Sequence, residues 1–470
     1  MPGKESLFLI KTLLDRDKNY IHACILEDID VICLNKETGK SKSMSFKLMH
    51  YNNSSFWVQN KIWEYYISHD DLIAAEKRLS ELSEPSERPV KPEKNTAQTD
   101  APKKEHNTIH ESLGKKYDSI AAMSEVDRVK HINDKKTKLE ALVTQMPKGK
   151  DKKVIAQVLV ESTHDTVLYN YATLMDTINL SNEDAKNKTQ EMVEATYALI
   201  KPSSQLISEN IFNDELINTL VSKSNGTIIQ HMTRVYMKGI AFLSWYNNLV
   251  LNSSINDKLR IAFKEKYLFF YHSLLPHDTI TLEKVFMGGM RAIPEETFSD
   301  WAVGFLLHDI GKAAAVEYHE GESAYNRDIV TEHIKIGYQS IMTKTNYPRS
   351  AGLIAGYHHE YYGDSSGYGL LRQTIELFKK THPHAKPYYC ITYDIEPLLN
   401  YEALAFFPAK FLEVVDVYDA FTDPNRKYRK ALSPMEALAA IRKEFIEMHQ
   451  KIDIILFDLF SKYIQESQAV

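Results

Sequence analysis

The segment LLHDIGK, residues 306–312, carries the adjacent His308 and Asp309 and gives the strongest indication of how this chain folds. Three further segments combine histidine or aspartate with glycine and aromatic residues: EHIKIG (332–337), GYHHEYYGDSSGYG (356–369) and FLEVVDVYDAFTDPNRKYRKA (411–431). Three of these four segments have helical periodicity. A histidine or aspartate on the inner face of a helix projects into the core of a bundle, as in carboxylate-bridged di-metal bundles. The pattern therefore predicts a helical bundle with metal ligands in its core.

The ligand types in these segments favour two divalent transition metals. Iron or manganese is the favoured metal, with zinc, nickel or cobalt as alternatives that imidazole also suits, and one aspartate can bridge two cations through its two oxygens. Five or six nitrogen ligands plus two carboxylates exceed what one tetrahedral zinc ion needs. Two cations about 3.5–4 Å apart hold a bridging hydroxide and clamp a phosphate during in-line displacement. Lys312 would stabilise charge on a phosphoryl oxygen of such a substrate.

The adjacent histidines His358 and His359 are the more specific signal, because two consecutive imidazoles in an apolar and aromatic run need polar partners when buried. An HD dipeptide alone is weak, since the chain has others at His69–Asp70, His164–Asp165 and His277–Asp278. The sequence contains no P-loop, no H-E-x-x-H zinc motif and no nucleophile elbow with a credible triad. These absences leave metal-dependent chemistry as the favoured interpretation.

Composition changes along the chain predict its domain organisation. Residues 1–82 alternate as short strands do, for example at 30–35 and 45–51, and predict a small mixed β module with a regulatory role that ends in a helix over 70–82. Residues 83–108 predict a disordered linker, because 83–105 holds four prolines, ten charged residues and no aromatic residue. Helical periodicity then predicts a connector or regulatory region over 109–224 and an all-helical domain over 225–470. The fold class is mainly α.

Charge and cysteine content exclude several function classes. The chain has 470 residues, with 57 basic and 63 acidic residues and a net charge of −6, so it has no global positive field for a nucleic acid polymer. The three cysteines Cys24, Cys33 and Cys390 are too scattered for a disulfide framework. No apolar run approaches the ~18 residues of a membrane span, and the N-terminus does not resemble a signal peptide. These features predict a cytoplasmic protein that does not associate with membranes.

In combination, HDIGK, the downstream H-x-x-x-G, HHE with a following D-x-x-G-Y, and D-x-Y-D-A with a trailing R-x-Y-R resemble the HD-GYP phosphodiesterases. This branch of the HD superfamily hydrolyses cyclic di-GMP, and the resemblance covers about residues 225–465. It implies an all-helical domain, a centre of two or three metals of iron or manganese type, and cleavage to pGpG or GMP.

Matched position by position, the resemblance implies a role for each motif residue. The HD pair falls on His308 and Asp309, with Asp309 as the bridging carboxylate and a catalytic residue. Lys312 matches the catalytic lysine that contacts the substrate phosphate. The remaining metal ligands fall on His333, His358, His359 and Asp416, and the substrate-binding positions on Tyr368, Arg426 and Arg429.

Two residues compete for the first histidine ligand of the family. His231 stands in the expected H-x-x-R-V setting with Arg234 and Val235, but it precedes His308 by 77 residues, an unusually long gap. His277 has the usual spacing and a poorer local match. We prefer His231 and leave His277 open. Members with a third metal have a glutamate four residues before this histidine, where the present chain has Thr227, so the resemblance implies two metals.

The GYP motif is degenerate in this chain, because it reads Asp364-Ser365-Ser366-Gly367-Tyr368-Gly369, with glycine in place of the proline. In the family this loop helps to form the substrate side and contacts partner proteins. We therefore expect the chemistry to persist while loop rigidity and the choice of partner change. Two insertions, about 249–293 and 370–407, could form a lid or a surface for a protein partner, and a homodimer is left open.

The leading hypothesis is a phosphodiesterase of bacterial second-messenger signalling, in which a metal-bridging hydroxide attacks a phosphorus atom of cyclic di-GMP. Two alternatives remain open. The first is a catalytically weak or inactive cyclic di-GMP receptor or adaptor, and the second is an HD phosphohydrolase that acts on another nucleotide. Metal content measured together with turnover discriminates between an enzyme and a receptor.

Overall fold

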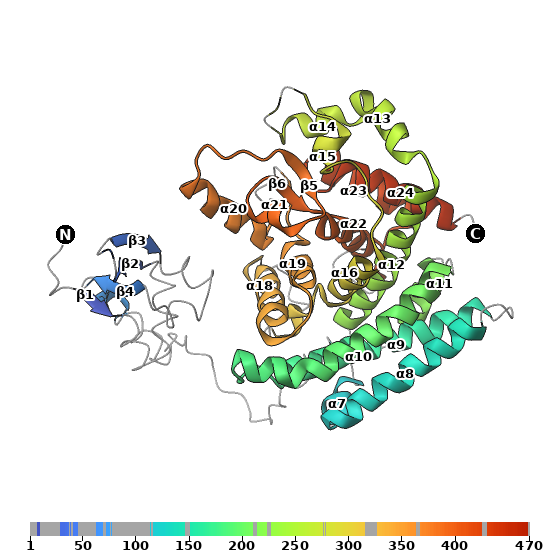
Figure 1. The fold of residues 1–470 in the computed structure, drawn as a ribbon. Coiled ribbons are helices and arrows are strands. Elements are labelled where there is room, and N and C mark those ends of the chain that lie inside the picture. The colour runs from blue at the N-terminus through green and yellow to red at the C-terminus, as the bar shows by residue number, and fades with distance from the viewer. Residues whose placement is uncertain are drawn as a thin grey trace, which may run out of the picture. The chain divides into compact units, whose positions relative to one another are not determined.

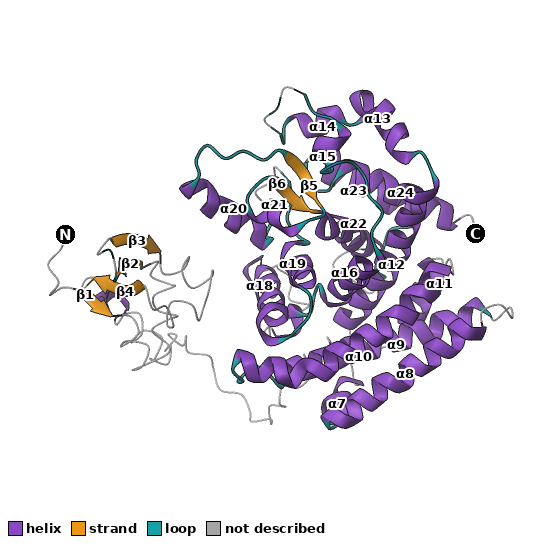
Figure 2. Cartoon of the chain, viewed as in Figure 1, coloured by secondary structure: helices purple, strands orange, loops and turns teal. Residues whose placement is uncertain are grey.

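The computed structural model describes residues 7–9, 29–36, 38, 41–45, 63–68, 72–75, 77, 113, 116–145, 151–209, 214–222, 227–275, 277, 279–314, 327–362, 367–424 and 430–468. The chain divides into two compact units, Met1–Ala101 and Pro102–Val470. The boundaries expected at residues 82, 108 and 224 are finer than this division and stay predictions. Helices make up most of the described structure, as expected for a mainly α chain (Figure 2). Among the described helices, none has the length and apolar character needed to cross a bilayer.

The first unit contains an antiparallel four-stranded sheet of order β1-β4-β2-β3. Side chains alternate between its faces, as the pleat requires, so Tyr65 and Ile67 are buried while Tyr66 between them is half-buried. The strands are β1 (Leu7–Leu9), β2 (Asp30–Asn35), β3 (Ser41–Ser45) and β4 (Trp63–Ser68). The strand expected at 30–35 is present. The one expected at 45–51 lies almost wholly outside the described residues, and the helix expected over 70–82 is described only at 72–75 and 77.

The second unit begins with a layer of long helices, in which α8, α9 and α10 run side by side (Figure 1). Helix α9 is buried over nearly its whole circumference, which places it in the interior of this layer. The layer consists of α7 (Lys116–Ala121), α8 (Glu125–Gln145), α9 (Lys152–Met175), α10 (Asn182–Glu209) and α11 (Asp214–Val221). Apolar residues recur with helical spacing over 153–199 in the sequence, but this stretch is not one helix, because α9 ends at Met175 and α10 begins at Asn182.

A bundle of helices packs against this layer and has an aromatic core. The rings of Phe242 and Phe411 stack with centroids 4.2 Å apart, and Phe305 stacks on Phe411 at 6.2 Å. These three rings join α12, α16 and α22, so the packing fixes the helices on which the sequence places metal ligands. The bundle comprises α12 (Thr227–Asn252), α16 (Glu295–Leu307), α17 (Gly311–Ala314), α18 (Arg327–Lys344), α19 (Arg349–Tyr357), α22 (Phe407–Thr422), α23 (Pro434–Ile441), a π-helical turn (Arg442–Glu447) and α24 (Ile454–Gln468).

The second of the two insertions expected at 249–293 and 370–407 contains a small parallel sheet, and the first insertion contacts it (Figure 2). Strand β5 pairs with β6, and Phe286 forms a bridge to Ile391 on β5. The first insertion contains α13 (Ile255–Lys266), α14 (Leu268–His272) and α15 (Leu282–Val285). The second contains α20 (Leu370–Thr381), β5 (Tyr389–Thr392), α21 (Ile395–Leu399) and β6 (Ala403–Phe406).

Candidate metal centre

The bundle brings the expected ligands together from five separate segments. His231 lies in the second turn of α12, His333 on α18 and Asp416 on α22. Helix α16 ends at the cap residue His308, so Asp309 follows in a tight turn, and α19 ends at the cap residue His358. His359 comes next in the chain. The side chains of all seven residues are almost completely buried.

A close backbone contact places the HD turn against α18. A Cβ atom on Gly311 would overlap the carbonyl of His333 and lie 2.5 Å from the amide nitrogen of Gly337. Glycine at 311 therefore lets the backbone after Asp309 touch the helix that carries His333. This contact explains the Gly of HDIGK and the H-x-x-x-G pattern as one packing requirement, and it sets the distance between Asp309 and His333.

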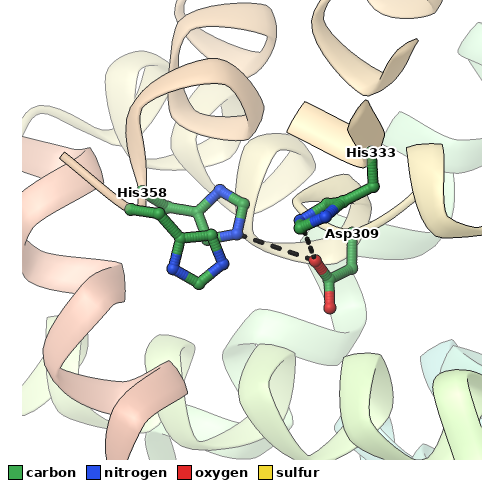
Figure 3. Close-up of side chains that lie close together, drawn as sticks. Asp309, His333 and His358 are labelled. Atoms are coloured by element: carbon green, nitrogen blue, oxygen red, sulfur yellow. Dashed lines mark ion pairs between the residues drawn. The ribbon is translucent and has the colours of Figure 1, made fainter. Parts of the chain in front are cut away.

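The two carboxylate oxygens of Asp309 face two different groups of histidines. Oδ1 lies 3.1 Å from Nε2 of His333 and 3.6 Å from Nε2 of His358 (Figure 3). Oδ2 lies 3.2 Å from Nε2 of His231 and 3.6 Å from Nε2 of His308. Each group is compact, with ligand atoms within 4.8 Å of one another. Asp309 is therefore common to two clusters, which are Asp309 with His333, His358 and His359, and Asp309 with His231 and His308.

Asp416 connects the same two clusters on another side. Its Oδ1 lies 3.0 Å from Nε2 of His231, and its Oδ2 lies 3.8 Å from Nδ1 of His359. Two carboxylates thus each offer one oxygen to each cluster. This arrangement can bridge two cations, because the two oxygens of a carboxylate can bind different ions.

The protein fixes which nitrogen of several imidazoles faces the centre. Nδ1 of His308 bonds the carbonyl of Phe305 at 3.0 Å, and Nδ1 of His358 bonds the carbonyl of Ala355 at 3.0 Å. A carbonyl only accepts, so Nδ1 carries the proton and Nε2 keeps its lone pair. Nε2 of both residues therefore faces the centre as a potential metal ligand, in the orientation that metal-binding histidines commonly have.

Buried polar atoms without hydrogen bonds test whether this site suits a metal. Nε2 of His231, Nε2 of His308, Nε2 of His358, Nδ1 of His359 and Oδ1 of Asp309 are all buried and make no hydrogen bond. Such atoms are rare in folded proteins because burial without a partner costs free energy. A shared metal would satisfy these nitrogen and oxygen atoms together, so the residues fit divalent cations. Number and identity of the ions stay predictions.

Electrostatics at the site agree with a cation-binding role. Burial alone would raise the pKa of Asp309, but Lys312 and the imidazoles around it hold that pKa well below its ordinary value. Burial lowers the pKa of His308 to about 3 and that of His359 well below its ordinary value, so both imidazoles are neutral at neutral pH. Despite burial, Asp309, Asp416 and Asp419 raise the pKa of His231 to about 10. These carboxylates therefore favour positive charge beside His231.

The remaining predicted residues have different outcomes. Nζ of Lys312 lies 2.5 Å from Oδ2 of Asp309, at the edge of the cluster. The ring of Tyr368 lies 4.4 Å from that of His359, measured between centroids. Arg426 and Arg429 lie outside the described residues. His277 is not in the cluster, because its Nε2 bonds the carbonyl of Pro387 and its ring stacks on Tyr388.

Two buried residues beside His231 were quoted in the sequence motifs but given no role there. Asp419 lies 2.9 Å from Nδ1 of His231 through Oδ2, and Nε of Arg234 donates to its Oδ1 at 2.8 Å. Arg234 is the arginine of H-x-x-R-V and Asp419 the second aspartate of D-x-Y-D-A. Their motif positions could have flagged them, whereas nothing in the sequence indicates that residues 188 positions apart meet.

Comparisons with known proteins add little to this geometry. No family model and no curated protein matches the sequence. Among solved structures, the chain is similar to Bd1817, described as an HDG"Y"P protein from Bdellovibrio bacteriovorus, with 13% identity over 93% of this chain and 95% of that chain. The TM-score is 0.37, which is too low to support an argument about fold or function. The case for a function therefore depends on the site itself.

Proposed function

We propose that this protein is a metal-dependent phosphodiesterase that hydrolyses cyclic di-GMP to pGpG or GMP. The single observation that carries the proposal is the sharing of Asp309 between two histidine clusters, with one carboxylate oxygen directed to each. Paired sites of this kind are typical of enzymes that cleave phosphate esters. The choice of cyclic di-GMP comes from the motif resemblance.

Specific residues would hold the two ions. Asp309 and Asp416 would bridge them, His231 and His308 would complete one site, and His333, His358 and His359 the other. The ions would supply Lewis-acid stabilisation of a phosphate and a nucleophilic water at neutral pH. The neutral state of His308 and His359, which burial enforces, keeps their nitrogen lone pairs ready for this role.

The chain itself would contribute orientation and charge. Lys312 reaches the edge of the cluster with its ammonium group and would bind a phosphoryl oxygen, which lowers the energy of the charged transition state. The ring of Tyr368 lies against that of His359 and would contact the dinucleotide beside the same cluster. Burial of all seven candidate ligands would keep the reacting phosphate in a site of low dielectric constant.

Anaerobic purification, metal analysis and chromatography of the products formed from cyclic di-GMP would test the proposal. We expect about two transition-metal ions per chain and a linear product, pGpG or GMP. Tight binding of the nucleotide without a linear product would instead support a receptor. Turnover of a mononucleotide but not of cyclic di-GMP would support the wider HD phosphohydrolase class. A metal-free protein that still hydrolyses the substrate would contradict the assigned centre.

A further inference from the structure

Residues Gly367–Gly369, the altered end of the GYP motif, lie against the backbone that follows the histidine pair. The amides of Tyr368 and Gly369 both donate to the carbonyl of His359, at 3.1 and 3.3 Å. The ring of Tyr368 lies on the ring of His359, with centroids 4.4 Å apart and planes inclined by 32°. This short segment therefore holds an aromatic ring against a candidate metal ligand.

Gly369 keeps the backbone conformation that a proline would have. Its φ of −64° and ψ of 155° lie in the polyproline region, which every L-residue adopts without strain. Glycine fits here because a Cβ atom would displace Oε2 of Glu360 and lie 3.0 Å from the Cβ and amide nitrogen of Glu360. A proline would also remove the amide that bonds His359. Glycine at position 369 thus accommodates the close approach of Glu360.

Glu360 is in turn held by residues of two other elements. Arg372, near the start of α20, donates from Nε to Oε1 of Glu360 at 3.2 Å and from Nη2 to the carbonyl of Tyr361 at 2.5 Å. Lys410 on α22 donates from Nζ to the carbonyl of Glu360 at 2.6 Å. The residues directly after the histidine pair are therefore held by hydrogen bonds from α20 and from α22. Of these two helices, α20 belongs to the insertion 370–407.

We propose that Glu360, Gly369 and Arg372 are positioning residues that together hold Tyr368 against His359. In the altered motif, the contact between Glu360 and Gly369 would then keep Tyr368 in place, a role that the motif's proline would otherwise have. The insertion would have a structural role at the centre, since its first helix supplies Arg372. The inference deepens the proposed function because it concerns the same centre, and its Mn²⁺ and turnover readouts rest on that function, whereas its hydrogen-exchange readout does not.

A double-mutant cycle tests the contact between Glu360 and Gly369. Gly369→Ala forces a Cβ into the carboxylate of Glu360, so we expect about tenfold weaker binding of Mn²⁺, measured from the EPR signal of free Mn²⁺. Hydrogen exchange of peptides covering 357–369 should accelerate in the same variant, since the two amide bonds to His359 are disturbed. Glu360→Ala alone should change both readouts less. In the double variant, Glu360→Ala removes Oε2 but keeps the Cβ and amide nitrogen of residue 360, so it should restore part of the loss caused by Gly369→Ala.

Gly367 provides a matched control for this cycle. A Cβ on Gly367 would lie 2.7 Å from the amide nitrogen of Tyr361 and 3.3 Å from the carbonyl of His359, so it meets backbone that Glu360→Ala does not remove. We expect Gly367→Ala to be harmful and not to be rescued. Equal rescue of both alanine variants would mean general loosening and would overturn the proposal. Unchanged exchange and Mn²⁺ binding in Gly369→Ala would overturn it too.

Arg372 supplies a second test that creates no steric clash. Arg372→Leu should accelerate exchange over 357–369 and raise KM for cyclic di-GMP more than it lowers kcat, while Arg372→Lys should restore little because lysine lacks the planar fork. Lys380→Leu, at an exposed position of the same helix, should match the unaltered protein. Unaltered exchange in Arg372→Leu would refute the positioning role. Absence of turnover in the unaltered chain, with these exchange effects intact, would refute the proposed function alone.

Discussion

Two buried histidine–aspartate pairs of this chain have different surroundings. Asp165, next to His164 on α9, contacts Nε2 of His131 at 2.9 Å and Nζ of Lys135 at 3.0 Å, and Lys116 pairs with its other oxygen. Its partners thus include two lysines, from α7 and α8. Asp165 and these cations join three helices of the long-helix layer.

Asp309 is as deeply buried as Asp165, yet most of its neighbours are imidazoles. Several of their nitrogen atoms face the centre without a hydrogen bond, and Lys312 is the lysine that contacts the carboxylate. The same histidine–aspartate dipeptide can therefore have two different roles. Where the chain supplies the cations, the pair stabilises the fold, and where it supplies lone pairs, the pair suits external cations. The partners of the aspartate, and not its burial, separate the two cases.

Exchanging each aspartate for asparagine should give the largest contrast. Asp309→Asn should reduce metal binding and turnover by at least about 100-fold, because the shared charge between the clusters is lost. Asp165→Asn should instead lower the free energy of unfolding by about 3 kcal/mol, since the partly exposed side chains of Lys116, His131 and Lys135 lose their charged partner. Metal analysis of the folded protein and urea unfolding separate these outcomes. A folded Asp165→Asn variant without metal would contradict the comparison.

Removing the metal should have a smaller effect that depends on only one of the two pairs. Because ions bind the folded state, metal at 100 times its Kd should add about 2.7 kcal/mol to the free energy of unfolding, and a chelator should remove it. The same change should occur in Asp165→Asn and be absent in Asp309→Asn. Thermal unfolding with and without chelator measures it. A chelator effect that survives in Asp309→Asn would place the metal elsewhere.

The two lysines that contact these aspartates provide a matched pair of substitutions. Lys312→Met should reduce turnover by about 100-fold, because a group that stabilises transition-state charge is lost, with metal content nearly unchanged. Lys135→Met, at a comparably buried position, should cost about 1 kcal/mol of stability and leave turnover intact. Steady-state kinetics and urea unfolding report the two effects. Loss of metal in Lys312→Met would indicate a structural role for this lysine.

Much of the fold and of the candidate site could be predicted because the signals are local. Helical periodicity predicts helices at 228–243 and 331–342, which lie within α12 and α18, and the capping box of Ser433 and Glu436 forms as expected. The helical spacing of apolar residues continues from Pro434 to Tyr463, but this stretch is not one helix, because a π-helical turn and a loop interrupt it before α24. Periodicity continues across such interruptions when the same face stays buried.

Contacts between distant segments were beyond prediction from the sequence. The choice between His231 and His277 depended on spacing, and spacing misleads here because α13, α14 and α15 lengthen the chain between His231 and His308 without separating them in space. The pairing of β5 with β6 had no signal either, since each strand has only four residues. The close approach of Glu360 to Gly369 has no signal in the sequence and is found only from the distances in the structure.

The pH dependence of stability should separate Asp165 from a third buried carboxylate, Glu413, which accepts from Lys410 at 2.7 Å. Burial would raise the pKa of Asp165, but His164, Lys116 and Lys135 hold it well below its ordinary value of 3.8. Burial raises the pKa of Glu413 to about 8 from 4.5, in spite of Lys410. The two groups therefore shift protons in opposite directions on folding.

The signs of the two pH effects follow from linkage. Asp165 stabilises the fold above pH 3.8, and this stability is lost as the pH falls further. Folded Glu413 holds a proton between pH 4.5 and about 8 that the unfolded chain has released, so its contribution is lost as the pH rises through that window. Its slope is at most about 1.4 kcal/mol per pH unit.

Urea unfolding of the chelated protein from pH 3 to 9 should resolve this contrast. Relative to the unaltered chain, Glu413→Gln should become more stable with rising pH between 4.5 and 8. Asp165→Asn should have a lower free energy of unfolding than the unaltered chain, and this difference should disappear only under acid conditions. Chelation matters because metal binding itself depends on pH. Parallel curves for Glu413→Gln and the unaltered chain would mean that Lys410 keeps Glu413 ionised. The Lys410 pair would then resemble the cluster around Asp165, where cations of the chain determine the charge.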